Sequence, residues 1–198
     1  MLDHVFTDAI GAMREVFEAA HLERQAFEEH FHSDVLLGDL TFETSYGLPG
    51  EGLPPRVRVD VTLVWPTWSQ TAYRLWYIGE EFDEPPRIDV ELVFRVQRLA
   101  TAPDPRIVLD VLPPETPEIG SEPLERGGPT VETIHLADLT DAEFALEVSY
   151  EGSYELAEEA LGDGTAIDKH FAAMGGWIAS MLVQLGDLRL EFLPPIEE

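Results

Sequence analysis

The sequence predicts an α+β fold: a mostly antiparallel, curved sheet of five to seven strands, with long N-terminal and C-terminal helices packed on its apolar face. Three observations predict it. Apolar residues recur every three or four positions near both ends of the chain, which is the helical period. Between these ends the period changes to two, the period of a strand. A chain of 198 residues can also bury one substantial core without disulfide or metal support.

The first expected element is a long amphipathic helix over about residues 2–31. Apolar side chains keep the helical spacing as far as Ala20, and Phe27 and Phe31 continue it approximately. After His32 the spacing changes, so we expect the helix to give way to strands there.

Three runs of alternating apolar and polar residues predict strands with one buried and one polar face, a pattern that favours antiparallel pairing. The runs are 56–65, 87–97 and 106–111. Two less regular segments, 35–46 and 70–78, predict further strands. The loops at 47–55 and 80–86, rich in Gly, Pro and acidic residues, predict hairpin connections.

The second half of the chain is expected to complete the same single domain, 1–198. Its first part, 113–129, is a Pro- and Gly-rich acidic excursion with no period. The elements expected after it are a strand over 144–150, a short acidic helix over 153–161, a helix from 165 to about 185, and a closing strand over 188–192.

The charge balance restricts the class of partner. Thirty-nine acids against 12 bases give a net charge of −27, which repels nucleic-acid phosphate and anionic lipid. Neither nucleic acid nor membrane is therefore expected as a direct ligand, and a basic protein is the expected partner. Only Lys169 among the bases is a lysine, which fits either a GC-rich genome or adaptation to high salt.

The chain contains no cysteine, which excludes a thiol nucleophile, a disulfide framework and a Cys-containing zinc site. Its first residues lack the positively charged start of a signal peptide. The uncharged stretch 170–184 is shorter than the roughly 20 residues that span a bilayer. A cytoplasmic location is expected.

One cluster of potential metal ligands stands out, at the end of the first expected helix. Its candidate ligands are His30, His32 and Asp34. On a helix the two histidines, two positions apart, would point to different faces, and the HExxH spacing is absent. A polar helix terminus is the alternative interpretation, and no cofactor is expected.

Arginines on the polar face of the expected sheet form a candidate recognition surface, because Arg is enriched at interfaces and binds carboxylates through two nitrogens. The candidate partner-binding residues are Arg56, Arg58, Arg87 and Arg95. The alternative is ion pairing with neighbouring carboxylates on a solvated face.

Small residues narrow one side of the last helix, where each interior glycine costs about 1 kcal/mol relative to alanine. They are Ala172, Gly175, Gly176 and Ala179. Close approach of another backbone would offset this cost. That backbone is either the N-terminal helix or the sheet of the same chain, or the same helix of a second copy in a homodimer.

No catalytic residue is predicted. Asp168, His170 and Ser180 could suggest a nucleophilic site, but no G-x-S-x-G elbow occurs and Ser180 lies within an expected helix. The glycine-rich loop 47–52 lacks the spacing of a phosphate-binding loop.

The favoured function is a non-enzymatic, acidic protein-binding module, adaptor or chaperone-like, that engages a basic protein. In composition, and in having a helix followed by strands, the chain resembles type III secretion chaperones, from which its Pro-rich stretch departs. One alternative is a small-ligand or metal-dependent enzyme with a pocket between helix and sheet. The aromatic residues that could line it are Trp65, Tyr73, Trp76 and Tyr77. A second alternative is a nucleic-acid mimic.

Overall fold

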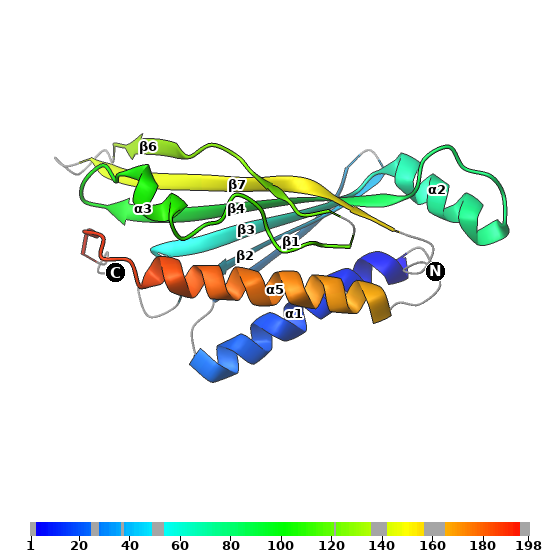
Figure 1. Cartoon of the computed structure of the whole chain (residues 1–198), viewed down its shortest axis with the longest axis horizontal. Coiled ribbons are helices and arrows are strands. Elements are labelled where there is room, and N and C mark those ends of the chain that lie inside the picture. The colour runs from blue at the N-terminus through cyan, green and yellow to red at the C-terminus, as the bar shows by residue number, and fades with distance from the viewer. Residues whose placement is uncertain are drawn as a thin grey trace.

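The computed structural model confirms an α+β protein built on an antiparallel sheet (Figure 1). The residues that it describes are 3–24, 28–36, 38–48, 54–120, 122–135, 142–156 and 165–194. Within them the sheet has seven strands in the order β1-β2-β3-β4-β7-β5, and β6 also pairs with β7.

The strands are β1 (Glu28–Leu36), β2 (Asp39–Gly47), β3 (Val57–Trp65), β4 (Arg87–Leu99), β5 (Glu125–Arg126), β6 (Thr130–Ile134) and β7 (Glu143–Glu155). The helices are α1 (Asp3–Arg24), α2 (Thr67–Ile78), α3 (Pro105–Leu109) and α5 (Thr165–Gly186). The strands expected at 56–65, 87–97 and 144–150 are confirmed as β3, β4 and part of β7. The C-terminal helix is confirmed as α5.

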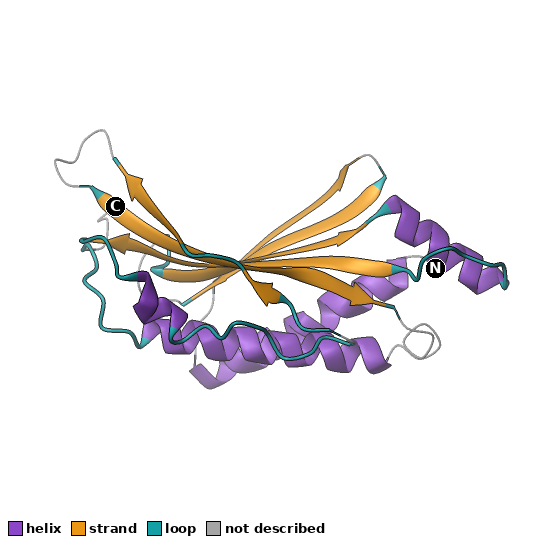
Figure 2. Cartoon of the chain, turned by 45° about the horizontal axis from the view of Figure 1, so that its top comes forward, coloured by secondary structure: helices purple, strands orange, loops and turns teal. Residues whose placement is uncertain are grey.

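The sheet has two faces of opposite character. Along β3 every second residue, from Val57 to Trp65, is buried, and the residues between them are partly exposed. The buried positions of β3, β4 and β7 belong to one core with apolar residues of α1 and α5. The two helices lie on the same side of the sheet (Figures 1 and 2). The opposite face, which we call the open face, carries mostly polar side chains together with Val64 and Val93.

The prediction of one helix over 2–31 is wrong at its end. Helix α1 ends at Arg24, and residues 28–36 form β1, which pairs with β2 in a hairpin. The expected single strand at 35–46 is therefore the end of one strand and most of the next. The apolar spacing of Phe27 and Phe31 fits either period over so few residues, so the spacing alone misplaced the boundary.

The strand predicted at 70–78 is instead helix α2. Its Tyr and Trp residues are typical of strands, but contacts with β2 favour a helix start at Thr67. Asp39 of β2 accepts hydrogen bonds from the backbone N–H of Thr67 (2.6 Å) and from its hydroxyl (2.8 Å). These bonds satisfy a free N–H group at the helix start and lower the pKa of Asp39. Gly79, in the left-handed conformation (φ 74°), ends the helix.

The strand predicted at 106–111 is also wrong, because Pro105–Leu109 form helix α3. The side chain of Asp104 accepts a hydrogen bond from the backbone N–H of Arg106, and Pro105 occupies the first turn. Both are helix-start signals that outweigh a short alternation of apolar residues.

Three smaller predictions for the C-terminal half of the chain differ from the structure. The excursion at 113–129 contains β5, which pairs with β7. Residues 153–155 belong to β7 rather than to an acidic helix, and positions 157–161 of that expected helix lie outside the described residues. The expected closing strand is reduced to an isolated bridge between Phe192 and Leu99.

Candidate functional site: the open face of the sheet

The four arginines that the sequence marked as partner-binding residues have contacts within the chain. Arg58 forms an ion pair with Asp60 (3.1 Å) and Arg87 with Asp89 (3.2 Å). Arg95 pairs with Glu132 on β6 (2.9 Å) and with Glu147 on β7.

The fourth arginine, Arg56, places its guanidinium over an aromatic ring. It lies 4.9 Å from the ring centroid of Phe192. Three of the four guanidinium groups therefore form ion pairs within the chain, and the fourth, that of Arg56, lies over Phe192.

A row of glutamates crosses the same face, and sequence reasoning missed it. The register places Glu43 of β2 opposite Thr62 of β3, and Thr62 opposite Glu91 of β4. Glu91 in turn lies opposite Glu151 of β7, which lies opposite Glu125 of β5. All four glutamates are exposed, and the described contacts give none of them an ion pair. We call these four residues the glutamate row.

Facing carboxylates in the row repel one another. Residues directly opposite on antiparallel strands have Cβ atoms about 4.5–5.5 Å apart, and like charges at that separation are destabilising. Glu151 faces a glutamate on each side, Glu91 and Glu125. The row therefore raises the free energy of the isolated chain, and a cation placed on it would lower that free energy.

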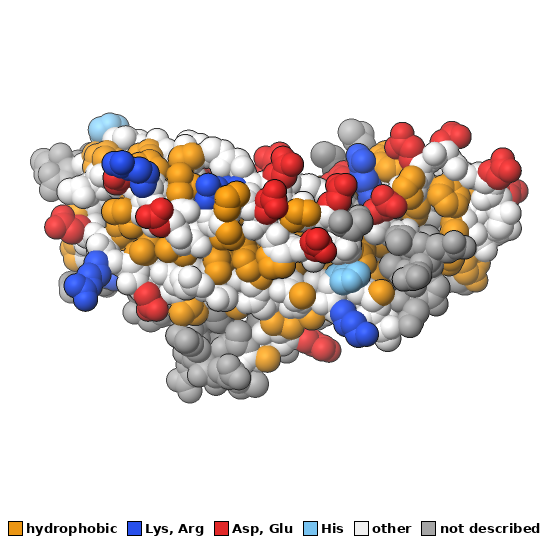
Figure 3. Space-filling view, in the orientation of Figure 1, with side chains coloured by type: hydrophobic (Ala, Val, Ile, Leu, Met, Phe, Trp, Pro, Cys, Tyr) orange, Lys and Arg blue, Asp and Glu red, His pale blue; other side chains and the backbone are white. Residues whose placement is uncertain are grey.

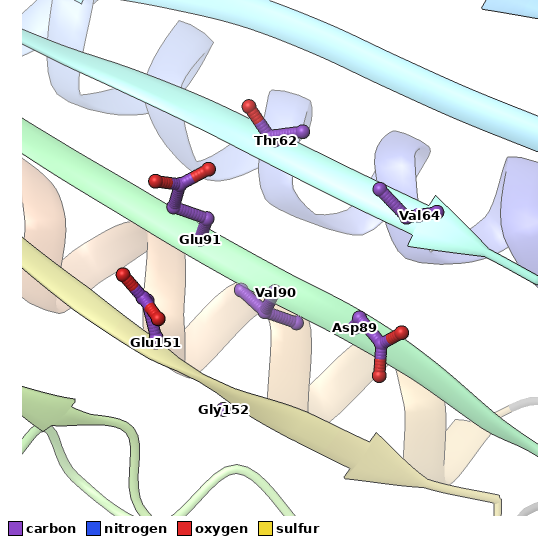
Figure 4. Close-up of a pocket in the computed structure, with 7 residues that line it drawn as sticks. All are labelled: Thr62, Val64, Asp89, Val90, Glu91, Glu151 and Gly152. Atoms are coloured by element: carbon purple, nitrogen blue, oxygen red, sulfur yellow. The ribbon is translucent and has the colours of Figure 1, made fainter.

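A shallow hollow lies at the middle of the row. It has a volume of about 390 Å³ and is lined by Thr62, Val64, Asp89, Val90, Glu91, Glu151 and Gly152. In Figure 4, Glu91 and Glu151 project from adjacent strands, and the ribbons of helices α1 and α5 pass behind the sheet. Because carboxylates border the hollow, it suits the cationic end of a Lys or Arg side chain.

We expect Glu91→Gln to stabilise the protein. Removing one charge of the facing pair Glu91–Glu151 should raise the free energy of unfolding by about 0.2–1 kcal/mol at low salt, and the gain should shrink as salt screens the repulsion. Urea unfolding followed by circular dichroism measures it. Glu118→Gln removes an equal charge at an exposed position that is not part of the row. Equal gains in both variants would show that the facing pair is not the cause.

The candidate metal ligands lie in β1 instead of at a helix end. The backbone register pairs His30 with Ser45, His32 with Glu43, and Asp34 with Thr41. The side chains of these three candidates are not among those that the structure describes. Across the described side chains, no group of three or more His, Cys, Asp or Glu residues could hold a metal ion.

The small residues of α5 lie against α1. A Cβ atom added to Gly175 would stand 3.2 Å from the backbone oxygen of Met13, and one added to Gly176 would stand 3.7 Å from Val16 Cγ1. Ala179 is buried and Ala172 is partly exposed. At Gly175 the close approach is therefore made within the chain, by the backbone of the N-terminal helix, whereas Gly176 meets α1 at an ordinary van der Waals distance.

The residues considered for nucleophilic catalysis are not assembled into a triad. Asp168 and Ser180 are exposed on α5. His170 Nδ1 lies 3.0 Å from the hydroxyl of Tyr154 on β7. Burial raises the pKa of Tyr154 to about 12, so this phenol stays protonated near neutral pH.

Three of the aromatic residues considered as a pocket lining, Trp65, Tyr73 and Trp76, pack against one another where the end of β3 meets α2. Trp65 and Tyr73 meet edge to face with ring centroids 5.7 Å apart, and the Tyr73 and Trp76 centroids are 5.8 Å apart. Trp65 is fully buried, whereas Tyr77 is 57% exposed. Trp65 thus belongs to the core and Tyr73 packs against it, whereas Tyr77 lies on the exposed side of α2.

Neither a membrane-spanning helix, in the part of the chain that the structure describes, nor a known relative accompanies the open face. No helix among the described residues combines the length and apolar character needed to cross a membrane. Comparison of the chain with protein-family models, with curated proteins and with solved structures finds no match.

Proposed function

We propose that this protein is a non-enzymatic protein-binding module, adaptor or chaperone-like, whose open face binds a basic segment of another protein in the cytoplasm. The observation that carries the proposal is the glutamate row. Its facing carboxylates repel one another in the free chain. Lysine or arginine side chains of a partner would convert that repulsion into attraction on binding.

The rest of the charge distribution supports a basic partner. The arginines of the open face pair with carboxylates of the same chain or stack on Phe192, so they leave little positive charge for an acidic ligand. The net charge of −27 adds long-range attraction that speeds encounter with a basic protein. Acidic side chains also gather along the upper side of the molecule in Figure 3, from its middle to the end formed by α2.

The first test is binding of a fluorescent oligolysine peptide, measured by anisotropy at several salt concentrations. The double variant Glu91→Gln with Glu151→Gln removes the centre of the row. We expect it to bind oligolysine about tenfold more weakly than the wild type, since charge-assisted contacts contribute about 1.5 kcal/mol or more, and to show a smaller salt dependence.

The matched control neutralises Glu118 and Glu122, two exposed acids outside the row. Its net charge equals that of the row variant, so general attraction to a polycation is the same in both. Equal loss of binding in the two variants would mean that oligolysine binds to the total charge and not to the open face, and would refute the proposal.

A second test identifies the partner. Immobilised wild type, row variant and control are incubated with native lysate at low salt and eluted with a salt gradient. We expect a basic protein that the wild type and the control retain and the row variant loses. A retained protein that ignores the row would contradict the proposal, and one whose own ligand is nucleic acid would favour mimicry instead.

A further inference from the structure

Exposed apolar side chains are concentrated on one element, α2 and the loop after it. In the described part of the chain six large hydrophobic residues are exposed, and four of them lie between positions 68 and 82. They are Trp68 (39% exposed), Tyr77 (57%), Ile78 (64%) and Phe82 (37%), which we call the α2 patch. Single exposed apolar residues are ordinary, but the concentration of four of them on one helix and its following loop marks this element as a candidate interaction surface.

The α2 patch sits on a firmly held element. Ser69 accepts a hydrogen bond from Trp65 Nε1 (3.0 Å) and donates one to the carbonyl of Arg87 (2.7 Å). The side-chain amide of Gln70 donates to the carbonyls of Gly38 (3.0 Å) and Trp65 (2.9 Å). These bonds fix the first turn of α2 to three strand ends, while the other end of the helix projects beyond the sheet (Figure 2).

Acidic residues adjoin the patch. The loop after α2 carries Glu80, Glu81, Asp83 and Glu84, all exposed, and the helix itself has a single base, Arg74. In Figure 3 red and orange side chains lie side by side over α2 and this loop. A ligand covering the patch would therefore meet apolar surface bordered by negative charge.

Contacts also connect the patch to the open face. The guanidinium of Arg87 lies 5.1 Å from the ring centroid of Trp68 and forms its ion pair with Asp89 at 3.2 Å. Asp89 lines the hollow beside Glu91 and Glu151. Trp68, at the start of α2, is thus linked through Arg87 and Asp89 to the hollow of the glutamate row.

We propose that the α2 patch binds the apolar side chains of the same basic segment, so that the ligand is an amphipathic, lysine- or arginine-rich stretch of protein. This inference rests on the proposed function and specifies its ligand. The negative net charge of the chain argues against a second copy of this chain as the ligand of the α2 patch. Two copies, each with a net charge of −27, would bring two acidic 80–84 loops together. Helix α2, at 12 residues and about 18 Å, is also short for a stable dimer interface.

The test uses two peptides of equal length and charge, an amphipathic lysine–leucine peptide and a lysine–serine peptide. The wild type should bind the lysine–leucine peptide at least about tenfold more tightly, because its leucines are buried on the patch. The variant Tyr77→Ser with Ile78→Ser should lose this preference and bind the lysine–serine peptide as the wild type does.

The chain supplies a matched control. Ile107 of α3 and Val131 of β6 are the other two large hydrophobic residues that are exposed in the described part of the chain, at 42% and 41%. Ile107→Ser with Val131→Ser should keep the full preference. Phe82→Ser, in the loop outside the helix, gives a second test that does not depend on the stability of α2, and we expect it to weaken lysine–leucine binding alone.

The outcomes separate the two proposals. A preference for the lysine–leucine peptide that survives both patch variants, or that the wild type lacks, overturns the α2 inference. If lysine–serine binding still depends on Glu91 and Glu151, the proposed function stands; if it does not, the proposed function fails independently. Dimerisation of the wild type that Tyr77→Ser with Ile78→Ser abolishes, seen by light scattering, would assign the patch to a second copy and also overturn the inference.

Discussion

Trp65→Ala is expected to lower the free energy of unfolding by about 3–5 kcal/mol, the usual cost of deleting a large buried ring. Trp65 ends β3, has no exposed surface, and packs edge to face against Tyr73 of α2. Its loss leaves a cavity where the sheet meets the helix that carries the α2 patch. Urea unfolding followed by far-ultraviolet circular dichroism measures the change.

Trp65→Phe separates the two contributions of this side chain. Phenylalanine keeps most of the apolar volume but removes the Nε1–H group that donates to Ser69. The expected cost is about 1–2 kcal/mol, close to that of one buried hydrogen bond with its partner left in place. If Trp65→Ala cost no more than Trp65→Phe, cavity formation would not be the main effect and the packing described here would be wrong.

Gly175→Val is expected to destabilise the protein by about 2 kcal/mol or more through overpacking between the two long helices. A Cβ at this position would already stand 3.2 Å from the backbone oxygen of Met13 and 3.4 Å from its Cγ. A backbone atom cannot rotate away as a side chain can, so the added methyl groups must push α1 from α5. Thermal and urea unfolding both report this loss.

Gly11→Ala provides the opposite expectation on the other helix. A Cβ added to Gly11 meets no atom within 4 Å, so alanine should gain about 0.5–1 kcal/mol from helix propensity alone. Destabilisation by both substitutions would indicate that any added side-chain atom in this helix pair is unfavourable, whether or not it meets a neighbouring atom. A stabilising Gly175→Val would show that the helices are not in close contact at that residue.

The parts of the fold that could be predicted are those where the two sides of an element differ in environment. Buried and partly exposed residues alternate regularly along β3, because one face of the strand packs on the core and the other faces solvent. Helix α2 lacks such a contrast, since it carries apolar residues on its exposed side as well. Its aromatic composition therefore suggested a strand, although Pro66 and Gly79 at its two ends are ordinary helix boundaries.

The candidate site was harder to predict because it depends on strand register. The sequence shows that Glu91 and Glu151 each lie on a polar strand face, but not that they stand opposite each other. Strand β7 reaches β4 only after the long excursion through β5 and β6. Basic residues are scarce in this chain, so the sequence favours the arginines as candidate binding residues. The structure gives three of these arginines ion pairs within the chain.

The contact between α1 and α5 also has a consequence for biosynthesis. Met13 packs against Gly175, about 160 residues later in the chain, so the N-terminal helix emerges from the ribosome long before its main packing partner. Contacts of such long sequence separation form late and slow folding. Until α5 has been synthesised, the apolar side of α1 lacks this packing partner in a partly folded chain. Apolar surface exposed in such a chain favours aggregation. The contact at Gly175 can therefore form only after almost the whole chain has been made, when its two ends come together over one core.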